Sequence, residues 1–91
     1  MESKTIDKYG YKEWRLPNGL LHREDEPAIE YLGNGNKYWY INGSLHREDG
    51  PAVEYASGAK RWCLNGKQYT ENEYKYEMRS RNLKKLLWNL N

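Results

Sequence analysis

The chain of 91 residues has a net charge of only +2 and one cysteine, which excludes a disulfide framework and gives no charge signature of a partner. No apolar leader follows Met1, and no run reaches the roughly 18 apolar residues of a membrane span, so we expect a soluble protein of the reducing cytoplasm. A domain this small buries only about 60–65% of its unfolded surface. The sequence therefore predicts one domain, residues 1–91, with a shallow core, and its nine Tyr and four Trp suit a thin sheet with a half-wet face.

Residues 1–8 show no pattern and are expected to form a lead-in, after which a repeat begins. Three segments share the form G-x-K-x-W, and each is followed by an Asn-Gly pair. The shared tryptophans are Trp14, Trp39 and Trp62. Repetition at a fixed period predicts a repeat architecture.

A longer string follows the first two Asn-Gly pairs. Residues 21–28 and 45–52 share L-H-R-E-D-x-P-A and differ only where Glu26 replaces Gly50, and a Glu-Tyr pair comes one residue later in both copies. After the third Asn-Gly pair the pattern decays. The unit is therefore about 24 residues long and occurs two and a half times over residues 9–69.

Each Asn-Gly pair predicts a β-hairpin, because Asn and Gly tolerate the positive φ of a type I′ turn. A two-residue loop places Trp39 opposite His46 in the second unit and Trp62 opposite Tyr69 in the third. The fold class that follows is mainly β: an antiparallel meander of tandem hairpin repeats, with about six or seven strands.

Pro17 adds one residue to the first loop. Because proline cannot donate to a strand ladder, it belongs at an edge or a turn. We expect it to shift the register or to force a bulge, so the pairing of Trp14 with His22 is left unpredicted.

A helix is expected over residues 70–90, closing the end of the sheet as terminal elements do in repeat proteins. Thr70 and Glu73 have the spacing of a capping box, and acidic residues precede basic ones, as the helix dipole favours. At 100° per residue one face carries Tyr76, Leu83, Leu86, Leu87 and Leu90. The opposite face carries Tyr74, Met78, Arg81, Lys85 and Trp88. We expect the first of these faces to pack on the sheet.

The unit G-x-K-x-W-x-x-N-G-x-L-H-R-E-D-G-P-A-x-E-Y resembles the MORN-like repeats of small phage and bacterial proteins, over roughly residues 10–69. This resemblance implies antiparallel hairpins and a non-enzymatic binding module. The chain departs from the pattern at Pro17, at Glu26 and in its truncated third unit, and the helix lies outside it. Size and character are similar to those of phage accessory proteins that neutralise host defences, in the cytoplasm of a bacterial host cell.

The run His46-Arg47-Glu48-Asp49 could supply an enzyme with a general base oriented by a carboxylate. Its second copy favours a structural role instead, because framework contacts recur with every unit whereas catalytic sites rarely do. We expect His46 to stack on Trp39 with no open cleft beside it, and Arg47 to pair with a carboxylate. The residues assigned to the repeat framework are Trp14, Trp39, Trp62, His22, His46, Arg23, Arg47, Asp25, Asp49, Pro27 and Pro51.

The sequence gives little support to metal or thiol chemistry. Binding of a metal by His22 and His46 with acidic neighbours is the weak alternative, since no C-x-x-C or His-x₃-His spacing exists, and we predict no cofactor. Cys63 occupies the position of Arg15 and Tyr40 in the other units, which predicts an outward-facing side chain and no nucleophile.

The favoured function is protein binding without catalysis, as a phage-encoded inhibitor that docks on a host defence protein or a toxin. Exposed Tyr, Trp and Arg are the usual anchors of protein interfaces. The residues expected to contact the partner are Tyr38, Tyr40, Tyr74, Arg81, Lys84, Lys85 and Trp88. The alternative is binding of RNA, DNA or a nucleotide by the basic, aromatic helix end. A homodimer that buries Trp88 is a further option.

Overall fold

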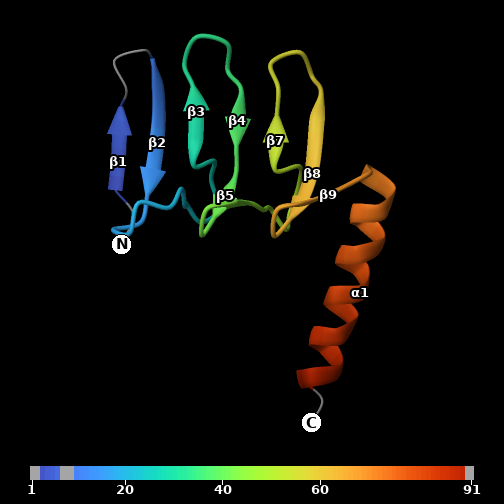
Figure 1. Ribbon diagram of the computed structural model, residues 1–91. Helices are drawn as coiled ribbons and strands as arrows, with labels where there is room; N and C mark the ends of the chain where they lie inside the picture. The colour runs from blue at the N-terminus through green and yellow to red at the C-terminus, as the bar shows by residue number, and fades with distance from the viewer. Residues whose placement is uncertain (1–2, 7–9, 90–91) are drawn as a thin grey trace.

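The computed structural model describes residues 3–6 and 10–89, with side chains described for residues 10–87, and this part of the chain is mainly β. The strands are β1 (Ser3–Ile6), β2 (Tyr11–Arg15), β3 (Ile29–Tyr31), β4 (Lys37–Tyr38), β5 (Tyr40–Ile41), β6 (Ser44–Leu45), β7 (Val53–Glu54), β8 (Lys60–Leu64) and β9 (Lys67–Tyr69), and they are followed by one helix, α1 (Glu71–Asn89). Figure 1 shows the strands side by side and the helix after the last of them.

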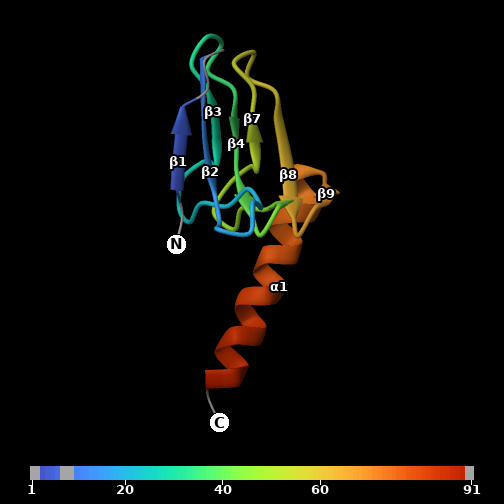
Figure 2. The ribbon, with the colours of Figure 1, turned by 60° about the vertical axis from the view of Figure 1, so that its left-hand side comes forward.

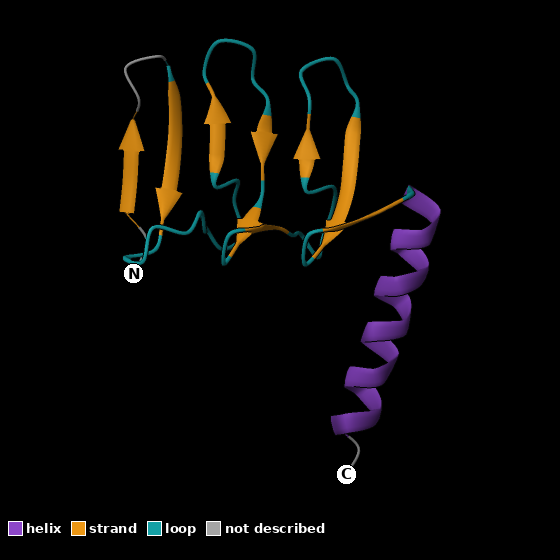
Figure 3. Ribbon diagram, in the orientation of Figure 1, coloured by secondary structure: helices purple, strands orange, loops and turns teal. Residues whose placement is uncertain are grey.

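Seven strands form one antiparallel sheet in the order β1-β2-β3-β4-β7-β8-β9, while β5 and β6 form a separate hairpin at its lower end (Figure 3). The antiparallel meander predicted from the turns is thus present. The expectation of an unpatterned lead-in is wrong for β1, which pairs with β2 and places Lys4 opposite Trp14. The four residues of β1 are too few to show a periodicity in the sequence. They are extended because they pair with the edge of β2.

The second and third Asn-Gly pairs form the predicted two-residue hairpin loops. Asn42 and Asn65 have φ values of 49° and 52°, and the glycine after each is also at positive φ, as a type I′ turn requires. Trp62 lies opposite Tyr69, and β5 pairs with β6 in the expected register. These loops confirm that the turn residues set the pairing of the strands.

The first loop absorbs Pro17 without a shift of register. The N–H of Gly19 donates to the carbonyl of Leu16 (2.8 Å), and Gly19 has a φ of 90°, which is a three-residue loop with a type I turn and a left-handed residue. The N–H of His22 still donates to the carbonyl of Trp14 (3.0 Å). The bulge alternative is therefore right, and Trp14 pairs with His22, a pairing that the sequence left unpredicted.

The core is shallow, in a molecule whose principal extents are 50 × 32 × 16 Å. One buried cluster consists of Trp39, Ala52 and Cys63, and a second, which joins the helix to the sheet, consists of Leu64, Tyr74 and Met78. The prediction that Cys63 faces outward is wrong, because its small thiol packs in the first cluster, where a compact apolar group fits.

The helix begins with the predicted capping box, in which the N–H of Glu73 donates to Thr70 Oγ1 (3.1 Å) and the N–H of Thr70 donates to Glu73 Oε1 (2.9 Å). It then extends beyond the lower end of the sheet (Figures 1 and 2). The side predicted to pack is wrong: Tyr74 and Met78 are buried, whereas Tyr76 and three leucines of the other face, at positions 83, 86 and 87, are exposed. Leu90 lies outside the described residues. Only the first turns lie beside β8 and β9, so the leucines of the last turns have no sheet to cover. Within residues 71–89 the helix is not apolar enough to cross a bilayer.

Candidate protein-binding surfaces

Four tyrosines form a continuous row across β2, β3, β4 and the end of β7, and we name Tyr11, Tyr31, Tyr38 and Tyr55 the tyrosine row. Their neighbouring ring centroids are 5.3, 5.7 and 6.3 Å apart, and the last two contacts are edge-to-face. The guanidinium of Arg61 on β8 lies 5.8 Å from the ring centroid of Tyr55 and extends the row. Edge-to-face rings at these distances attract one another, so the row is ordered by its own contacts.

The sequence pattern explains part of this row. Tyr31 and Tyr55 are the tyrosines of the repeated Glu-Tyr pair, whereas Tyr11 and Tyr38 stand at positions that vary between units. Tyr38 was expected at the surface, and Tyr11 and Tyr31 were missed, although alternation along the strands places them on the same face. Tyr40 lies outside the row and is half-buried, and burial raises the pKa of its hydroxyl.

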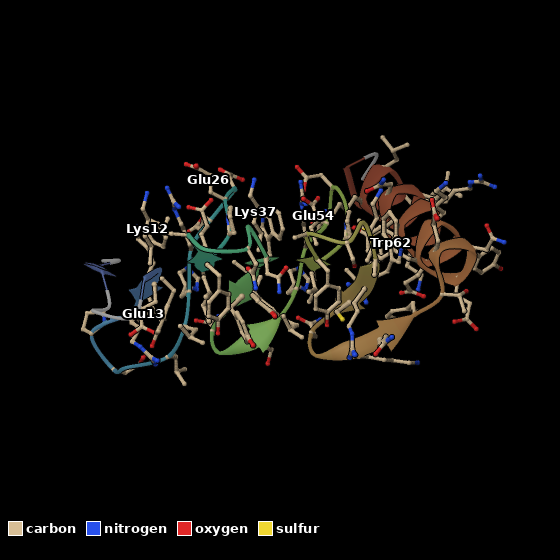
Figure 4. The ribbon with its side chains drawn as sticks, turned by 90° about the horizontal axis from the view of Figure 1, so that it is seen from above. Lys12, Glu13, Glu26, Lys37, Glu54 and Trp62 are labelled. Atoms are coloured by element: carbon tan, nitrogen blue, oxygen red, sulfur yellow. The ribbon has the colours of Figure 1, made fainter. Side chains whose placement is uncertain are left out.

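The other face of the sheet carries charges of alternating sign on successive strands. Directly paired positions run Lys12, Glu30, Lys37, Glu54, Lys60. In Figure 4, Lys12, Lys37 and Glu54 point to the side where the helix lies, and Glu13 points to the opposite side. The tyrosine row shares the face of Glu13, since Tyr11 is two residues away on β2. The helix therefore leaves the tyrosine row uncovered.

Each of the two histidines accepts a hydrogen bond from the turn of the next hairpin in the chain. Nδ1 of His22 accepts the N–H of Asn42 (3.0 Å), and Nδ1 of His46 accepts the N–H of Asn65 (2.9 Å). With Nδ1 as acceptor, the neutral ring carries its proton on Nε2. That nitrogen of His46 lies 3.0 Å from Glu48 Oε2, so both ring nitrogens of His46 are engaged.

The arginine that follows each histidine covers the tryptophan of its own unit. Cζ of Arg23 lies 3.8 Å from the ring centroid of Trp14, and Cζ of Arg47 lies 3.8 Å from that of Trp39. A guanidinium stacks well on an aromatic face because it is planar and weakly hydrated. Arg47 thus covers one face of Trp39, and the expected stacking of His46 on that ring stays a prediction.

The same arginines fasten the turn that ends each string. Nη1 of Arg23 donates to the carbonyl of Pro27 (3.4 Å), and Nη1 of Arg47 donates to that of Pro51 (3.1 Å). Both prolines are buried. Nε of Arg47 also donates to Asp49 Oδ1 (3.0 Å), so the predicted pairing of Arg47 with a carboxylate is present. The stack on the tryptophan and the hydrogen bond to the proline carbonyl are present in both units. In each unit they join the string to the strand that carries the tryptophan.

A groove of about 520 Å³ lies between the two strings and the helix, which corrects the expectation of no cleft beside His46. Arg23 lines it from the first unit, His46 from the second, and Met78 and Asn82 from the helix. The hydrogen bond from His46 lowers the pKa of Glu48 at the wall of this groove. Within the groove, Glu48 pairs with His46 and Asp49 pairs with Arg47.

Tyr74 is a docking residue within the molecule, which corrects its prediction as a partner contact. Its Oη donates to the carbonyl of Arg47 (2.5 Å) and accepts the N–H of Gly50 (3.3 Å). Its ring packs on Trp62, with 4.9 Å between centroids. Burial raises the pKa of the Tyr74 hydroxyl. The side chain therefore attaches the helix to the second string and to the last tryptophan.

The basic residues of the helix are partly engaged by acids. Nε of Arg81 lies 2.8 Å from Glu77 Oε2, and that hydrogen bond raises the pKa of Arg81. Nζ of Lys85 lies 3.8 Å from a carboxylate of the second string. Lys84 is exposed, and the side chain of Trp88 lies outside the described residues. The structure thus leaves a smaller basic surface than the sequence indicates.

The chain matches no protein-family model, no curated protein and no solved structure. In the part of the chain whose side chains are described, no three His, Cys, Asp or Glu side chains are grouped so that they could hold a metal ion. Within the described residues, the tyrosine row on the sheet and the exposed side of the helix present large aromatic and apolar side chains.

Proposed function

We propose that this protein is a small non-enzymatic binding module that docks another protein on its tyrosine row. The observation that carries the proposal is the row itself, four adjacent tyrosines on the sheet face that the helix leaves uncovered. Tyrosine supplies a large amphipathic contact area through few rotatable bonds. Because the rings already pack on one another, less side-chain entropy is lost on binding.

The ring geometry favours a protein partner over nucleic acid. Successive rings from Tyr31 to Tyr55 are inclined by 76° and 88°, whereas stacked bases need open ring faces along a basic groove. Two charged side chains lie close to the row. Arg61 lies at one end, beside Tyr55, and Glu13 lies on the face of β2 that carries the row, opposite to the face of Lys12. Edges and hydroxyl groups of the rings are suited to the polar and apolar atoms of a protein surface.

The contacts of the histidines support a non-enzymatic role. Nδ1 of His46 accepts a backbone N–H and Nε2 contacts Glu48, so a general base would first have to give up a structural hydrogen bond. His22 makes the equivalent bond to the next hairpin. The same chemistry in both units supports a framework of tandem MORN-like repeats.

The biological role that we propose is inhibition: a phage-encoded protein that binds a host defence protein or a toxin in the bacterial cytoplasm. The motif resemblance supports this role, and the tyrosine row offers the surface that it needs. Capture of RNA or DNA by the helix end is the outcome that would contradict it.

The test is a pull-down from bacterial lysate, with and without nuclease, using the wild type and two variants. Tyr31→Ala removes a ring that is 38% exposed in the middle of the row. Lys37→Ala is the matched control, because it lies on the opposite face of the adjacent strand. We expect a stoichiometric protein that resists nuclease, is lost with Tyr31→Ala and is retained with Lys37→Ala. Equal capture by all three proteins would show that the row is not the binding site.

A further inference from the structure

The helix carries a second recognition surface, on the side turned away from the sheet. Tyr76, Leu83 and Leu86 are 71%, 56% and 61% exposed. Such large apolar side chains, grouped on a surface, mark an interaction site. They lie opposite the buried Tyr74 and Met78. Tyr76 borders β9 in a shallow pocket shared with Gln68 and Tyr69, and it is still largely exposed, so a partner can reach this side of the helix.

The spacing on this side is that of a helix pair. Asn72, Tyr76, Arg79, Leu83 and Leu86, all exposed, follow one another at alternating steps of four and three residues. This is the spacing of the seam between two packed helices. Leu90 continues it in the sequence and lies outside the described residues. At about 1.5 Å per residue, the 14 residue steps from Asn72 to Leu86 give a seam on the order of 21 Å long.

The charges along the helix decide which partner fits. Residues 71–78 contain three acidic side chains and one basic one, whereas residues 79–89 contain four basic side chains and no acidic one. Arg81 and Lys85 lie on the side of Tyr74 and Met78 and pair with Glu77 and Glu48, so the basic half contributes Arg79 and Lys84 to the exposed side. Two such helices side by side in the same direction would bring like charges together. In opposite directions, the acidic half of one faces the basic half of the other.

We propose that the exposed side of α1 binds a second copy of this chain, as an antiparallel helix pair about a twofold axis. A twofold interface uses the same patch on both copies, and this helix is complementary to itself in charge only when the pair is antiparallel. Keeping the seam positions in contact sets Tyr76 of one copy opposite Leu86 of the other, and Arg79 opposite Leu83. The two sheets then lie on the outer sides of the pair, and both tyrosine rows stay open.

The first experiment measures mass by sedimentation equilibrium over a wide concentration series. The wild type is expected to reach twice the monomer mass, and Leu83→Asp is expected to remain a monomer because a carboxylate replaces an apolar seam residue. Leu32→Asp is the matched control, since Leu32 has the same exposed fraction of 56% but lies between β3 and β4. It should dimerise like the wild type. A wild type that stays monomeric throughout, or a Leu83→Asp dimer, overturns the proposal.

The second experiment tests direction. Tyr76→Cys and Leu86→Cys are oxidised separately and as a mixture, and Cys63 does not compete because it is buried. An antiparallel pair gives the mixed disulfide in the mixture and little disulfide from either variant alone. Efficient disulfide formation by each variant alone would indicate a parallel pair and would overturn the proposed arrangement.

Discussion

The ring of Tyr74 packs on the ring of Trp62 in the one unit that lacks an L-H-R-E-D string. In the two preceding units an arginine of the string covers the tryptophan, as Arg23 and Arg47 do. The helix supplies the missing cover and binds the second string through the Tyr74 hydroxyl. A repeat that ends without its own closing string is thus completed by a residue from outside the repeat.

Tyr74→Phe should separate the two roles of this side chain. The ring contact with Trp62 is kept, while the hydrogen bonds to Arg47 and Gly50 are lost, so we expect the free energy of unfolding to fall by about 1–3 kcal/mol. Urea unfolding followed by tryptophan fluorescence measures the change. Tyr76→Phe, on the exposed side of the helix, is the control and should be neutral. Equal stability of Tyr74→Phe and wild type would mean that the hydroxyl does not hold the helix.

Gly50→Ala should disturb the arginine that covers Trp39. A methyl group at Gly50 would lie 3.0 Å from Cζ of Arg47, closer than side chains normally approach. The guanidinium can move, but only by giving up part of its stack, so we expect a loss of about 1 kcal/mol. Gly33→Ala is the control, because Gly33 has open space around it and no positive φ. Thermal unfolding of both variants gives the comparison, and an unchanged midpoint for Gly50→Ala would contradict the crowding.

Stability in acid should depend on Glu48. The hydrogen bond from His46 lowers the pKa of Glu48 in the folded state, and Lys85 acts in the same direction. The unfolded chain therefore binds a proton at a higher pH, near the usual value of about 4.3, and the contribution of Glu48 to stability is lost as the pH falls through the folded pKa. The effect is small, because this side chain is about half exposed.

The measurement is the unfolding free energy of wild type and Glu48→Gln from pH 7 to strongly acidic pH. The wild type should be the more stable protein at neutral pH, and the difference should shrink below about pH 4.3. A difference that grows on acidification would contradict the assigned direction of the pKa.

Cys63 should be inert in the folded protein. Its side chain is buried, and burial raises the pKa of the thiol, so little thiolate is available for attack. We expect no reaction with Ellman's reagent at pH 8 until a denaturant unfolds the chain, when one thiol per chain reacts. Rapid labelling of the native protein at the rate of a free thiol would show that the first core cluster opens readily.

Local chemistry made much of this fold predictable. The Asn-Gly turns at Asn42 and Asn65 require positive φ, and the capping box at Thr70 satisfies its own N–H groups, so each is determined within a few residues. Because the sequence repeats, a hairpin predicted in one unit could also be predicted in the next. The tyrosine row follows partly from the same alternation, which indicates a shared face for Tyr31 and Tyr55 without showing that their rings touch.

Long-range packing explains what the sequence did not reveal. Helical periodicity separates Tyr74 from Tyr76, but the side that packs depends on where Trp62 and the second string lie in space. The burial of Cys63 likewise depends on the neighbouring Trp39 and Ala52 rather than on the residues at equivalent positions. Such contacts join segments far apart in the chain, and no local pattern encodes them.

Glu26 shows how one unit tolerates a change that the other would resist. Its neighbour Asp25 has a φ of 68°, whereas Asp49 is not at positive φ, so the two turns take different paths. Glu26 Oε2 lies 3.0 Å from Nη2 of Arg23, so the side chain pairs with the arginine of its own string. The single difference between the two strings is therefore accompanied by a local change of backbone.

Among the described residues, the helix packs on β8, on β9 and on the last complete string, so its attachment does not depend on how many units come before. A chain lengthened by one further unit of about 24 residues could keep the same closing element, since stability in repeat proteins is a sum of units and nearest-neighbour contacts. Each added Glu-Tyr pair would lengthen the tyrosine row by one ring. The size of the partner that such a surface covers could then vary by duplication or loss of a unit, and an engineered chain with one further unit should unfold at a higher urea concentration than this one.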